Sequence, residues 1–421
     1  MALLFLDLFA GAGGLSEGFI QAGYVPVAHV EMDKAACFTL KTRASYHYLK
    51  HTEQGRQWYK SYLEKEISRV QFYSRVPQGI LDSVINATIG EDTMASILAK
   101  LKTLCNGRAV DVIVGGPPCQ AYSVAGRAIL KARSKEDPRK QLYKYYAQFL
   151  EVIQPKVFVF ENVLGLFTAK DFYGNLILPQ IRERLDKSGY VLHEYVYSAD
   201  DHGIPQRRKR IIIVGIRKDL NFLLNDLPCQ ECPVTIGELF SDLAPIHAGE
   251  GSVHGDGRRR GAKPNSALVN LGISDTEYPV TYHKARFNNA HDLEIYRRVV
   301  ELWNLHHERF NYAKDLPLEM RTHKNVKGFL DRFKVVDAKA HSSHTVLAHM
   351  CKDGHYYIHP DINQNRSLSP REAARLQTFP DNYFFEAPTE KECLSSAYRQ
   401  IGNAVPVRLA RLVAEQIKHN L

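Results

Sequence analysis

Val112-Ile113-Val114-Gly115-Gly116-Pro117-Pro118-Cys119-Gln120 is a short apolar run that ends in a stiff turn and a cysteine. The run from Asp111 to Val114 is uninterrupted and rich in β-branched residues, which is typical of a strand buried on both faces of a parallel sheet. Ligands bind just beyond the carboxyl ends of the strands in such sheets. Cys119 is therefore placed to react, and we take it as a candidate nucleophile.

Other predicted strands alternate with helices along this chain of 421 residues. Strands are predicted at residues 3–9, 24–30, 110–114, 157–160 and 211–216, and the first two are followed by helices at 16–22 and 33–42. A polar insert of helical character, from about residue 44 to about residue 105, interrupts the pattern. The alternation predicts an α/β fold with a mostly parallel, doubly wound sheet.

The character of the sequence changes after about Arg217, where His, Asn and Gly become frequent and the periodicity weakens. We expect strands again at residues 344–350 and 355–358, and helices at 370–377 and 407–419. Ser369 and Glu372 form the capping pattern of the first of these helices. The sequence therefore predicts two domains, a large one of residues 1–220 and 396–421 and a smaller one of residues 221–395.

Charge and cysteine content narrow the class of protein. Lys and Arg total 55 against 46 Asp and Glu, and the basic residues cluster at 127–144, 207–210 and 258–263, which favours contact with phosphates of a nucleic acid. No apolar run is long enough to span a bilayer. Seven scattered cysteines favour a reducing cytosol, and the pair Cys229 and Cys232 has no second pair at a zinc spacing, so no metal is expected.

The first predicted strand leads into Asp7-Leu8-Phe9-Ala10-Gly11-Ala12-Gly13-Gly14 and then into a helix. Glycines at such a turn let the backbone approach a ligand, and a helix N-terminus favours an anionic group. Because residue 16 is Ser, the spacing is not the G-x-G-x-x-G of a dinucleotide cradle. Glu31 ends the second strand, where a carboxylate can accept hydrogen bonds from two ribose hydroxyls. Together these features predict a nucleoside-containing cofactor.

Two further polar segments lie at predicted strand ends. Glu161 directly follows the strand at 157–160, where a carboxyl group in a low-dielectric pocket can donate a proton at neutral pH, although a helix cap is the simpler alternative. In Gln206-Arg207-Arg208-Lys209-Arg210, alternate residues share one face of a strand. We therefore expect Arg208 and Arg210 to point together at one site.

These segments, taken in order, carry a family resemblance. They are Phe5-x-Asp7-Leu8-Phe9-Ala10-Gly11-x-Gly13-Gly14, Gly116-Pro117-Pro118-Cys119-Gln120, Glu161-Asn162-Val163, Gln206-Arg207-Arg208-x-Arg210, the block at residues 366–381, and Gly402-Asn403-Ala404-Val405-Pro406. Over about residues 3–40, 108–217 and 343–410 the chain resembles DNA (cytosine-5)-methyltransferases of the prokaryotic restriction-modification type. The resemblance implies the Rossmann-like, doubly wound sheet of S-adenosylmethionine-dependent methyltransferases, with residues 221–395 as a smaller target-recognition domain.

The resemblance also implies a covalent mechanism. The Cys119 thiolate would attack C6 of a cytosine flipped out of double-stranded DNA, while Glu161 would protonate or hydrogen-bond its N3. Arg210, with Arg208 nearby, would hold the base. C5 would then take the methyl group of S-adenosylmethionine, and loss of the C5 proton would release Cys119. The basic loop from about residue 120 to about residue 144 would close over the DNA.

Further contacts follow from the same resemblance. For the cofactor they are Asp7, Phe9, Ala10, Gly11, Gly13, Glu31, Met32, Pro118, Leu142 and Asn403. For DNA they are Gln120, Ser123, Arg127 and Thr345. Family members place an Asp before an Ile to hold the adenine amine. The corresponding stretch, Asn86-Ala87-Thr88-Ile89, lacks that Asp, so the adenine contact is not identified.

Two other interpretations stay open beside this one. A tRNA cytosine-5 methyltransferase of the same fold would carry Cys-Phe-Thr in the variable region, and residues 220–343 contain no such tripeptide. A catalytically inactive DNA-binding homologue is the second, although Cys119, Glu161 and Arg210 are all present. We expect a monomeric, cytoplasmic prokaryotic enzyme that is associated with the nucleoid through DNA. It would be paired functionally with a restriction endonuclease without a stable complex.

Overall fold

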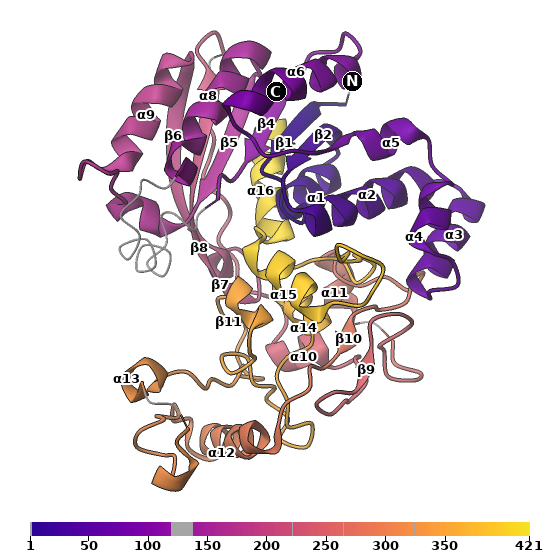
Figure 1. Ribbon diagram of the computed structural model, residues 1–421, viewed down its shortest axis with the longest axis vertical. Helices are drawn as coiled ribbons and strands as arrows, with labels where there is room; N and C mark the ends of the chain where they lie inside the picture. The colour runs from indigo at the N-terminus through magenta and orange to yellow at the C-terminus, as the bar shows by residue number, and fades with distance from the viewer. Residues whose placement is uncertain (1, 119–137, 221, 264, 323–324) are drawn as a thin grey trace.

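The computed structural model describes residues 2–118, 138–220, 222–263, 265–322 and 325–421. Its centre is a seven-stranded sheet of order β3-β2-β1-β4-β5-β8-β6 (Figure 1). The strands are β1 (Leu4–Leu8), β2 (Val25–Glu31), β3 (Val84–Asn86), β4 (Val112–Gly115), β5 (Val157–Asn162), β6 (Tyr190–Ser198) and β8 (Lys209–Arg217).

The sheet is parallel except for one strand. β1, β2, β3, β4 and β5 pair in parallel, whereas β8 runs antiparallel to both of its neighbours, β5 and β6. Leu8 pairs with Val30 and Gly115, and Gly115 pairs with Phe160. The residues that follow these four positions therefore meet at one edge of the sheet, and the prediction of a mostly parallel sheet is confirmed.

Helices cover both faces of the sheet, as a doubly wound fold requires. One face packs against α6 (Glu91–Cys105), α8 (Leu142–Ile153) and α9 (Ile177–Lys187), and the other against α1 (Gly14–Gln21) and α16 (Val407–Lys418). A Cβ atom at Gly18 of α1 would lie only 2.5 Å from the Ala410 side chain of α16. The C-terminal helix, predicted at residues 407–419, therefore packs closely against α1, and both helices share one hydrophobic core with the sheet.

The insert between the second and third predicted strands is mostly helical, but not throughout. After the long helix α2 (Lys34–Leu49) it contains α3 (Glu53–Leu63), α4 (Arg69–Tyr73) and α5 (Gln78–Asp82). It also contains the edge strand β3, so the expectation of a purely helical insert is wrong at that point. Three residues are too few to show the alternation by which a strand is recognised.

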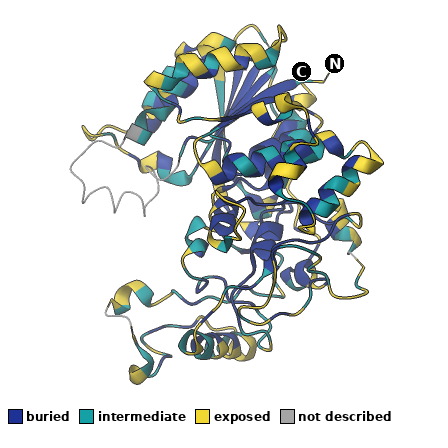
Figure 2. Ribbon diagram, turned by 45° about the vertical axis from the view of Figure 1, so that its right-hand side comes forward, coloured by how far each residue is buried: buried dark blue, intermediate teal, exposed yellow. Residues whose placement is uncertain are grey.

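A second lobe lies below the sheet in Figure 1 and contains little regular structure. Its elements include α10 (Ile236–Phe240), β9 (Gly251–Ser252), α11 (Ser266–Asn270), β10 (His283–Lys284), α12 (Ala290–His306), α13 (Val326–Phe329), α14 (Pro370–Leu376) and α15 (Leu394–Asn403). The capping box of Ser369 and Glu372 is present at α14, as predicted. Figure 2 shows buried residues along the strands and at the junction of the two lobes.

The strands expected at residues 344–350 and 355–358 are wrong. Only Ser343–His344 forms a strand, β11, which pairs with β7 (Gln206–Arg207), and residues Ala348–Cys351 form a 3-10 turn, η6. Hydrogen bonds from side chains replace a strand ladder here. Tyr357 Oη donates to the Thr345 carbonyl at 2.8 Å and accepts from the Leu347 amide at 2.8 Å.

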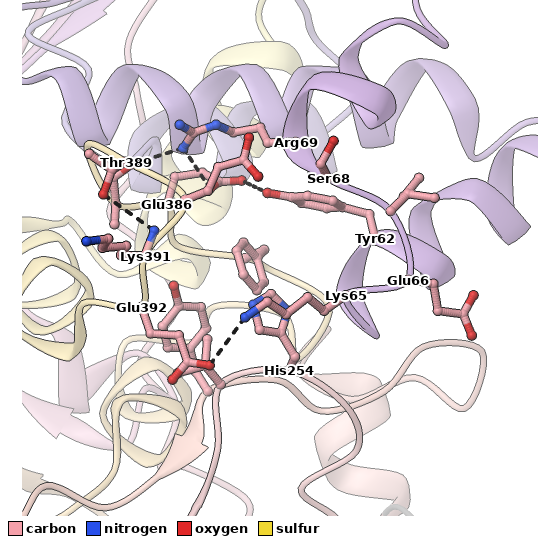
Figure 3. Close-up of a pocket in the computed structure, with 16 residues that line it drawn as sticks. Tyr62, Lys65, Glu66, Ser68, Arg69, His254, Glu386, Thr389, Lys391 and Glu392 are labelled. Atoms are coloured by element: carbon pink, nitrogen blue, oxygen red, sulfur yellow. Dashed lines mark hydrogen bonds and ion pairs between the residues drawn. The ribbon is translucent and has the colours of Figure 1, made fainter.

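A buried carboxylate of the second lobe, Glu386, binds side chains of the insert and of the preceding helix α2. Glu386 accepts a hydrogen bond from Tyr62 at 2.5 Å and pairs with Arg69 at 3.2 Å (Figure 3). It also accepts a hydrogen bond from Thr42 of α2 at 2.6 Å. Burial raises the pKa of Glu386 above its ordinary value. Residues of α3 and α4 also share one hydrophobic core with residues of the second lobe. The predicted boundaries of the two domains remain a prediction.

Candidate active site at the carboxyl edge of the sheet

The turn after β4 is fixed against the end of β5. Asn162, which is fully buried, donates from Nδ2 to the Pro117 carbonyl at 3.1 Å, and its Oδ1 accepts from the Val163 amide at 3.0 Å. The backbone that leads to Cys119 is therefore held by the strand that carries Glu161. Cys119 itself, with Gln120, Ser123 and Arg127, lies outside the described residues.

Glu161 lies at the same edge and pairs with Arg210. Arg210 Nε is 2.6 Å from Glu161 Oε1, and the two side chains are only 10% and 12% exposed. A Cβ atom at Gly116 would lie 2.8 Å from Glu161 Oε2, so a glycine is needed there for the carboxylate to sit against the turn. The structure thus brings together Glu161, Arg210 and the turn before Cys119.

Arg208 does not join Arg210 at the Glu161 ion pair in the way the sequence suggested. Its guanidinium donates to the carbonyls of Val346 at 2.7 Å and Gly402 at 3.1 Å. The chain passes from β7, which pairs with β11, to β8, which pairs with β5 and β6. Because Arg208 lies between two strands with different partners, simple alternation does not bring the two guanidinium groups to one point.

Gln206 also joins the large lobe to the second lobe by hydrogen bonds. Its Oε1 accepts from the Val346 amide at 2.7 Å, and its Nε2 donates to Gln377 Oε1 at 2.9 Å. Both backbone polar groups of Val346 are therefore bound by side chains from the segment at 206–208. Thr345, the neighbouring residue, donates from Oγ1 to the Arg207 carbonyl. This arrangement fixes the segment that carries Thr345 beside the sheet.

Replacing Arg208 with Met should lower the free energy of unfolding by roughly 2–4 kcal/mol, because two buried carbonyls lose their donor. Arg208 is 1% exposed. Urea denaturation of the wild type and the variant measures the difference. The exposed neighbour Arg207 gives a matched control, and Arg207→Met should change stability by no more than about 0.5 kcal/mol. Equal stability of the Arg208 variant and the wild type would rule out this anchoring role.

The glycine loop after β1 is held by the carboxylate that ends β2. Glu31 Oε2 accepts from the Gly11 amide at 2.8 Å, and Oε1 accepts from the amides of Met32 at 2.8 Å and Asp33 at 2.7 Å. Burial raises the pKa of Glu31 above its ordinary value. Phe9 and Gly11 have φ values of 58° and 55°, and a Cβ atom at Gly11 would meet no described atom within 4 Å. The loop therefore leaves open space beside Glu31.

Asp7 lies fully buried below this loop. Ser16 donates from Oγ to Asp7 Oδ2 at 2.5 Å, whereas Oδ1 has no hydrogen-bond partner among the described residues. Burial, the largest cause, raises the pKa of Asp7 to about 7. The carboxyl is thus close to half protonated at neutral pH.

Replacing Asp7 with Asn should make stability less dependent on pH. Between about pH 4 and pH 7 the folded state keeps a proton that the unfolded chain, with an ordinary pKa of 3.8, has lost, so stability falls as pH rises. The limiting slope is about 1.4 kcal/mol per pH unit. Urea titrations at about pH 5 and pH 6.5 should show a loss roughly 1–2 kcal/mol larger in the wild type than in the variant. Equal losses would contradict a raised pKa.

The other predicted cofactor positions lie around the loop and at the junction of the lobes. Met32 is 61% exposed directly after β2, and Asn86, at the end of β3, donates to the carbonyls of Glu31 and Met32. Asn403, the last residue of α15, is exposed. Gly13, the N-cap residue directly before α1, has a φ of 82°. Ala10 is buried, and Pro118 and Leu142 are half-buried.

Sequence reasoning missed the residues that hold this edge together. Asn162, Gln206 and Gln377 have no periodic signature, and their positions within the family segments were the only available signal. The arginines of the block at 366–381 are also structural. Arg366 forms two hydrogen bonds with Glu372, and Arg375 binds both Asp242 and Asp381, all almost fully buried.

Two further features concern metals and membranes. Among the described residues, no group of three or more His, Cys, Asp or Glu side chains is placed to hold a metal ion. Cys229 is exposed and Cys232 is buried. No helix in the described ranges is both long and apolar enough to cross a bilayer.

The sheet with one reversed strand, the glycine loop after β1 and the carboxylate at the end of β2 form the Rossmann-like fold of S-adenosylmethionine-dependent methyltransferases. The sequence matches the profile of C-5 cytosine-specific DNA methylases over residues 3–67 and 92–419. The chain belongs to this family.

Individual relatives agree with this assignment. The chain is 37% identical over 453 aligned residues to the type II methyltransferase M.Bpa9945I of Bacillus paralicheniformis, covering 99% of this chain and 98% of the relative. It is 28% identical to the type II methyltransferase M1.HphI of Haemophilus parahaemolyticus, covering 99% and 87%. In structure it is similar to a protein described as a DNA modification methyltransferase of an Escherichia coli prophage, with a TM-score of 0.65, 21% identity and coverage of 100% and 99%.

Proposed function

We propose that this protein transfers a methyl group from S-adenosylmethionine to C5 of a cytosine within a specific double-stranded DNA sequence. The observation that carries the proposal is the buried pair of Glu161 and Arg210 beside the turn that leads to Cys119. Membership of the cytosine-specific family supports the choice of base. Protection of host DNA from a cognate restriction endonuclease is part of the proposal, because the relatives are named as type II methyltransferases.

The residues around the glycine loop fit an adenosine-containing cofactor. The Glu31 carboxylate, beside open space at Gly11, has acceptor capacity for ribose hydroxyls. The exposed Met32 side chain offers an apolar surface for adenine, and Asn403 lies at the lobe junction. When bound, S-adenosylmethionine supplies a methyl group on a positively charged sulfonium. Asp7, Phe9, Ala10, Gly13, Pro118 and Leu142 complete the proposed set of contacts.

The catalytic proposal assigns one act to each of three side chains. The Cys119 thiolate forms a bond to C6 of the cytosine, which makes C5 nucleophilic. Glu161 donates a proton or hydrogen bond to N3, so that negative charge does not accumulate on the ring. Arg210 orients the Glu161 carboxyl through the 2.6 Å contact and is placed to contact the base. Removal of the C5 proton after methyl transfer breaks the bond between Cys119 and C6.

A stacked base cannot reach this edge, so the target cytosine must leave the duplex. We propose that Gln120, Ser123 and Arg127 contact the DNA around the vacated position and that Thr345 contacts its backbone. Arg208 serves this arrangement indirectly, since it fixes Val346 and Gly402. The second lobe, from about residue 221 to about residue 395, is the proposed region of sequence recognition.

Bisulfite sequencing tests the function and identifies the target sequence in the same experiment. Genomic DNA from a cytosine-methylation-deficient bacterial host that expresses the chain should show one short sequence in which a single cytosine position is protected from conversion. DNA from the same host with a Cys119→Ser variant provides the matched control and should show no protection. Complete conversion with the wild-type chain, at verified expression, would reject the proposal. Protection of tRNA alone would favour an RNA substrate.

A further inference from the structure

A large pocket lies behind the glycine loop, between α1 and α2. Its volume is about 920 Å³, within the range of small-molecule sites. Gly13, Ser16, Val25 and Leu104 are among the residues that line it, and Figure 1 shows α1, α2 and α5 on this side of the sheet. Of the proposed cofactor contacts, Gly13 alone lines this pocket as the structure describes it. The pocket is therefore not the cofactor site.

The acidic group of this pocket is already neutralised. Arg43 binds Glu17 through two hydrogen bonds of 2.8 and 2.6 Å, and His47 Nε2 lies 3.0 Å from the same carboxylate. Although burial alone would raise the pKa of Glu17, the charge of Arg43 holds it well below its usual range. Glu17 is the only carboxylate among the described residues of the lining. It leaves no negative charge to repel an anion.

Two histidines of the lining have buried ring nitrogens without a hydrogen-bond partner among the described residues. His29 is 3% exposed, and its Nδ1 has no hydrogen-bond partner among the described residues. Nδ1 of His47 is likewise unpartnered within the described part of the chain. Burial lowers the pKa of His29 to about 4, so its ring is neutral at pH 7. A buried polar atom of this kind calls for a hydrogen-bond partner.

The remaining lining combines apolar walls with cations. Ile20, Leu40, Ala44 and Ile80 are among the apolar residues, whereas the cations beyond Arg43 are Lys50, Arg75 and Arg108. The Arg75 guanidinium stacks 5.2 Å from the centre of the Trp58 ring. A ligand that fits has an apolar body and an anionic end.

One wall of the pocket includes a segment that the family profile does not match. Arg75, Gly79, Ile80 and Ser83 line it and belong to residues 68–91, the segment that the family profile does not match.

We propose that the pocket between α1 and α2 binds a small amphipathic anion, with an apolar body between the helices and an anionic group at Lys50, Arg75 and Arg108. The His29 ring forms part of the wall around the body of the ligand. The proposal goes beyond the methylation of DNA and does not depend on it.

Anilinonaphthalene sulfonate, which has two apolar ring systems (phenyl and naphthalene), an N–H group and one sulfonate, is a suitable probe. Titration into the full-length protein, followed by fluorescence, should show saturable binding of one molecule per chain. Saturating S-adenosylhomocysteine should leave the Kd within about twofold, because the two sites are separate. N-Phenyl-naphthylamine, the same molecule without the sulfonate, should bind roughly fivefold more weakly because it forms no ion pairs.

Two variants, each with a control substitution on α6, test whether the probe binds in this pocket. Ala44→Trp fills the pocket and should weaken binding at least about tenfold, whereas Ala99→Trp, on the exposed side of α6, should not. Arg75→Glu should weaken binding roughly fivefold, against no change for Lys102→Glu on α6. Thermal unfolding of the Ala44 variant shows that it is folded.

Four results would overturn the proposal. They are the absence of saturable binding, displacement by S-adenosylhomocysteine, wild-type affinity in the Ala44→Trp variant, and equal affinity for the uncharged probe. Since none of these readouts involves methyl transfer, their failure leaves the proposed function untouched.

Discussion

Cys119→Ser should abolish DNA methylation, with a loss of at least about 10⁴-fold in kcat. A serine hydroxyl is ionised far less than a thiol near neutral pH and cannot add to C6 at a useful rate. The turn before Cys119 is held by Asn162 through the Pro117 carbonyl, and this contact does not involve the thiol. The variant should therefore fold normally. Incorporation of tritium from labelled S-adenosylmethionine into DNA measures the loss.

Cys229→Ser is the matched control for this substitution. Cys229 is an exposed free cysteine outside the proposed site, so its replacement should leave the rate within about twofold of the wild type. Thermal unfolding should be unchanged for both variants. Methylation by the Cys119 variant at even one hundredth of the wild-type rate would contradict nucleophilic catalysis by this thiol.

Glu161→Gln should lower kcat by roughly 10²- to 10⁴-fold, the usual contribution of a general acid. Gln has nearly the same shape as Glu but has no acidic proton to deliver to N3, and it removes the charge that pairs with Arg210 at 2.6 Å. KM values for DNA and S-adenosylmethionine should change by no more than about threefold, because binding groups elsewhere are intact. Steady-state kinetics with both substrates separates the two parameters.

The control for Glu161→Gln is Glu183→Gln, an exposed glutamate on α9 that pairs with Lys187. Its kcat should equal that of the wild type. If Glu161→Gln raised KM and left kcat unchanged, Glu161 would contribute to binding alone, and the assignment of proton donation to it would be wrong.

Local sequence patterns predicted the sheet and the residues at its carboxyl edge. The apolar run at 110–114 overlaps strand β4. Glu31 and Glu161 lie at the ends of β2 and β5, as expected. These predictions succeeded because a buried parallel strand requires a continuous apolar run, and the residue after that run must face the ligand edge.

The features that sequence reasoning missed depend on contacts between distant segments. The orientation of Arg208 follows from the change of partner strand between β7 and β8, which the pattern of residues 206–210 does not contain. The segment at 344–350 is held by Gln206, Arg208 and Tyr357 instead of by a strand ladder. Such long-range hydrogen bonds leave no local periodicity.

Trapping with 5-fluorocytosine tests the central claim most directly. Fluorine at C5 cannot leave as a proton does, so the bond between the enzyme and C6 should persist after methyl transfer. DNA that carries 5-fluorodeoxycytidine in the recognised sequence, incubated with the protein and S-adenosylmethionine, should give a denaturation-resistant complex. Mass spectrometry of its peptides should place the adduct on Cys119. Methylation of ordinary DNA without a trapped complex, or an adduct on a different cysteine, would contradict the account.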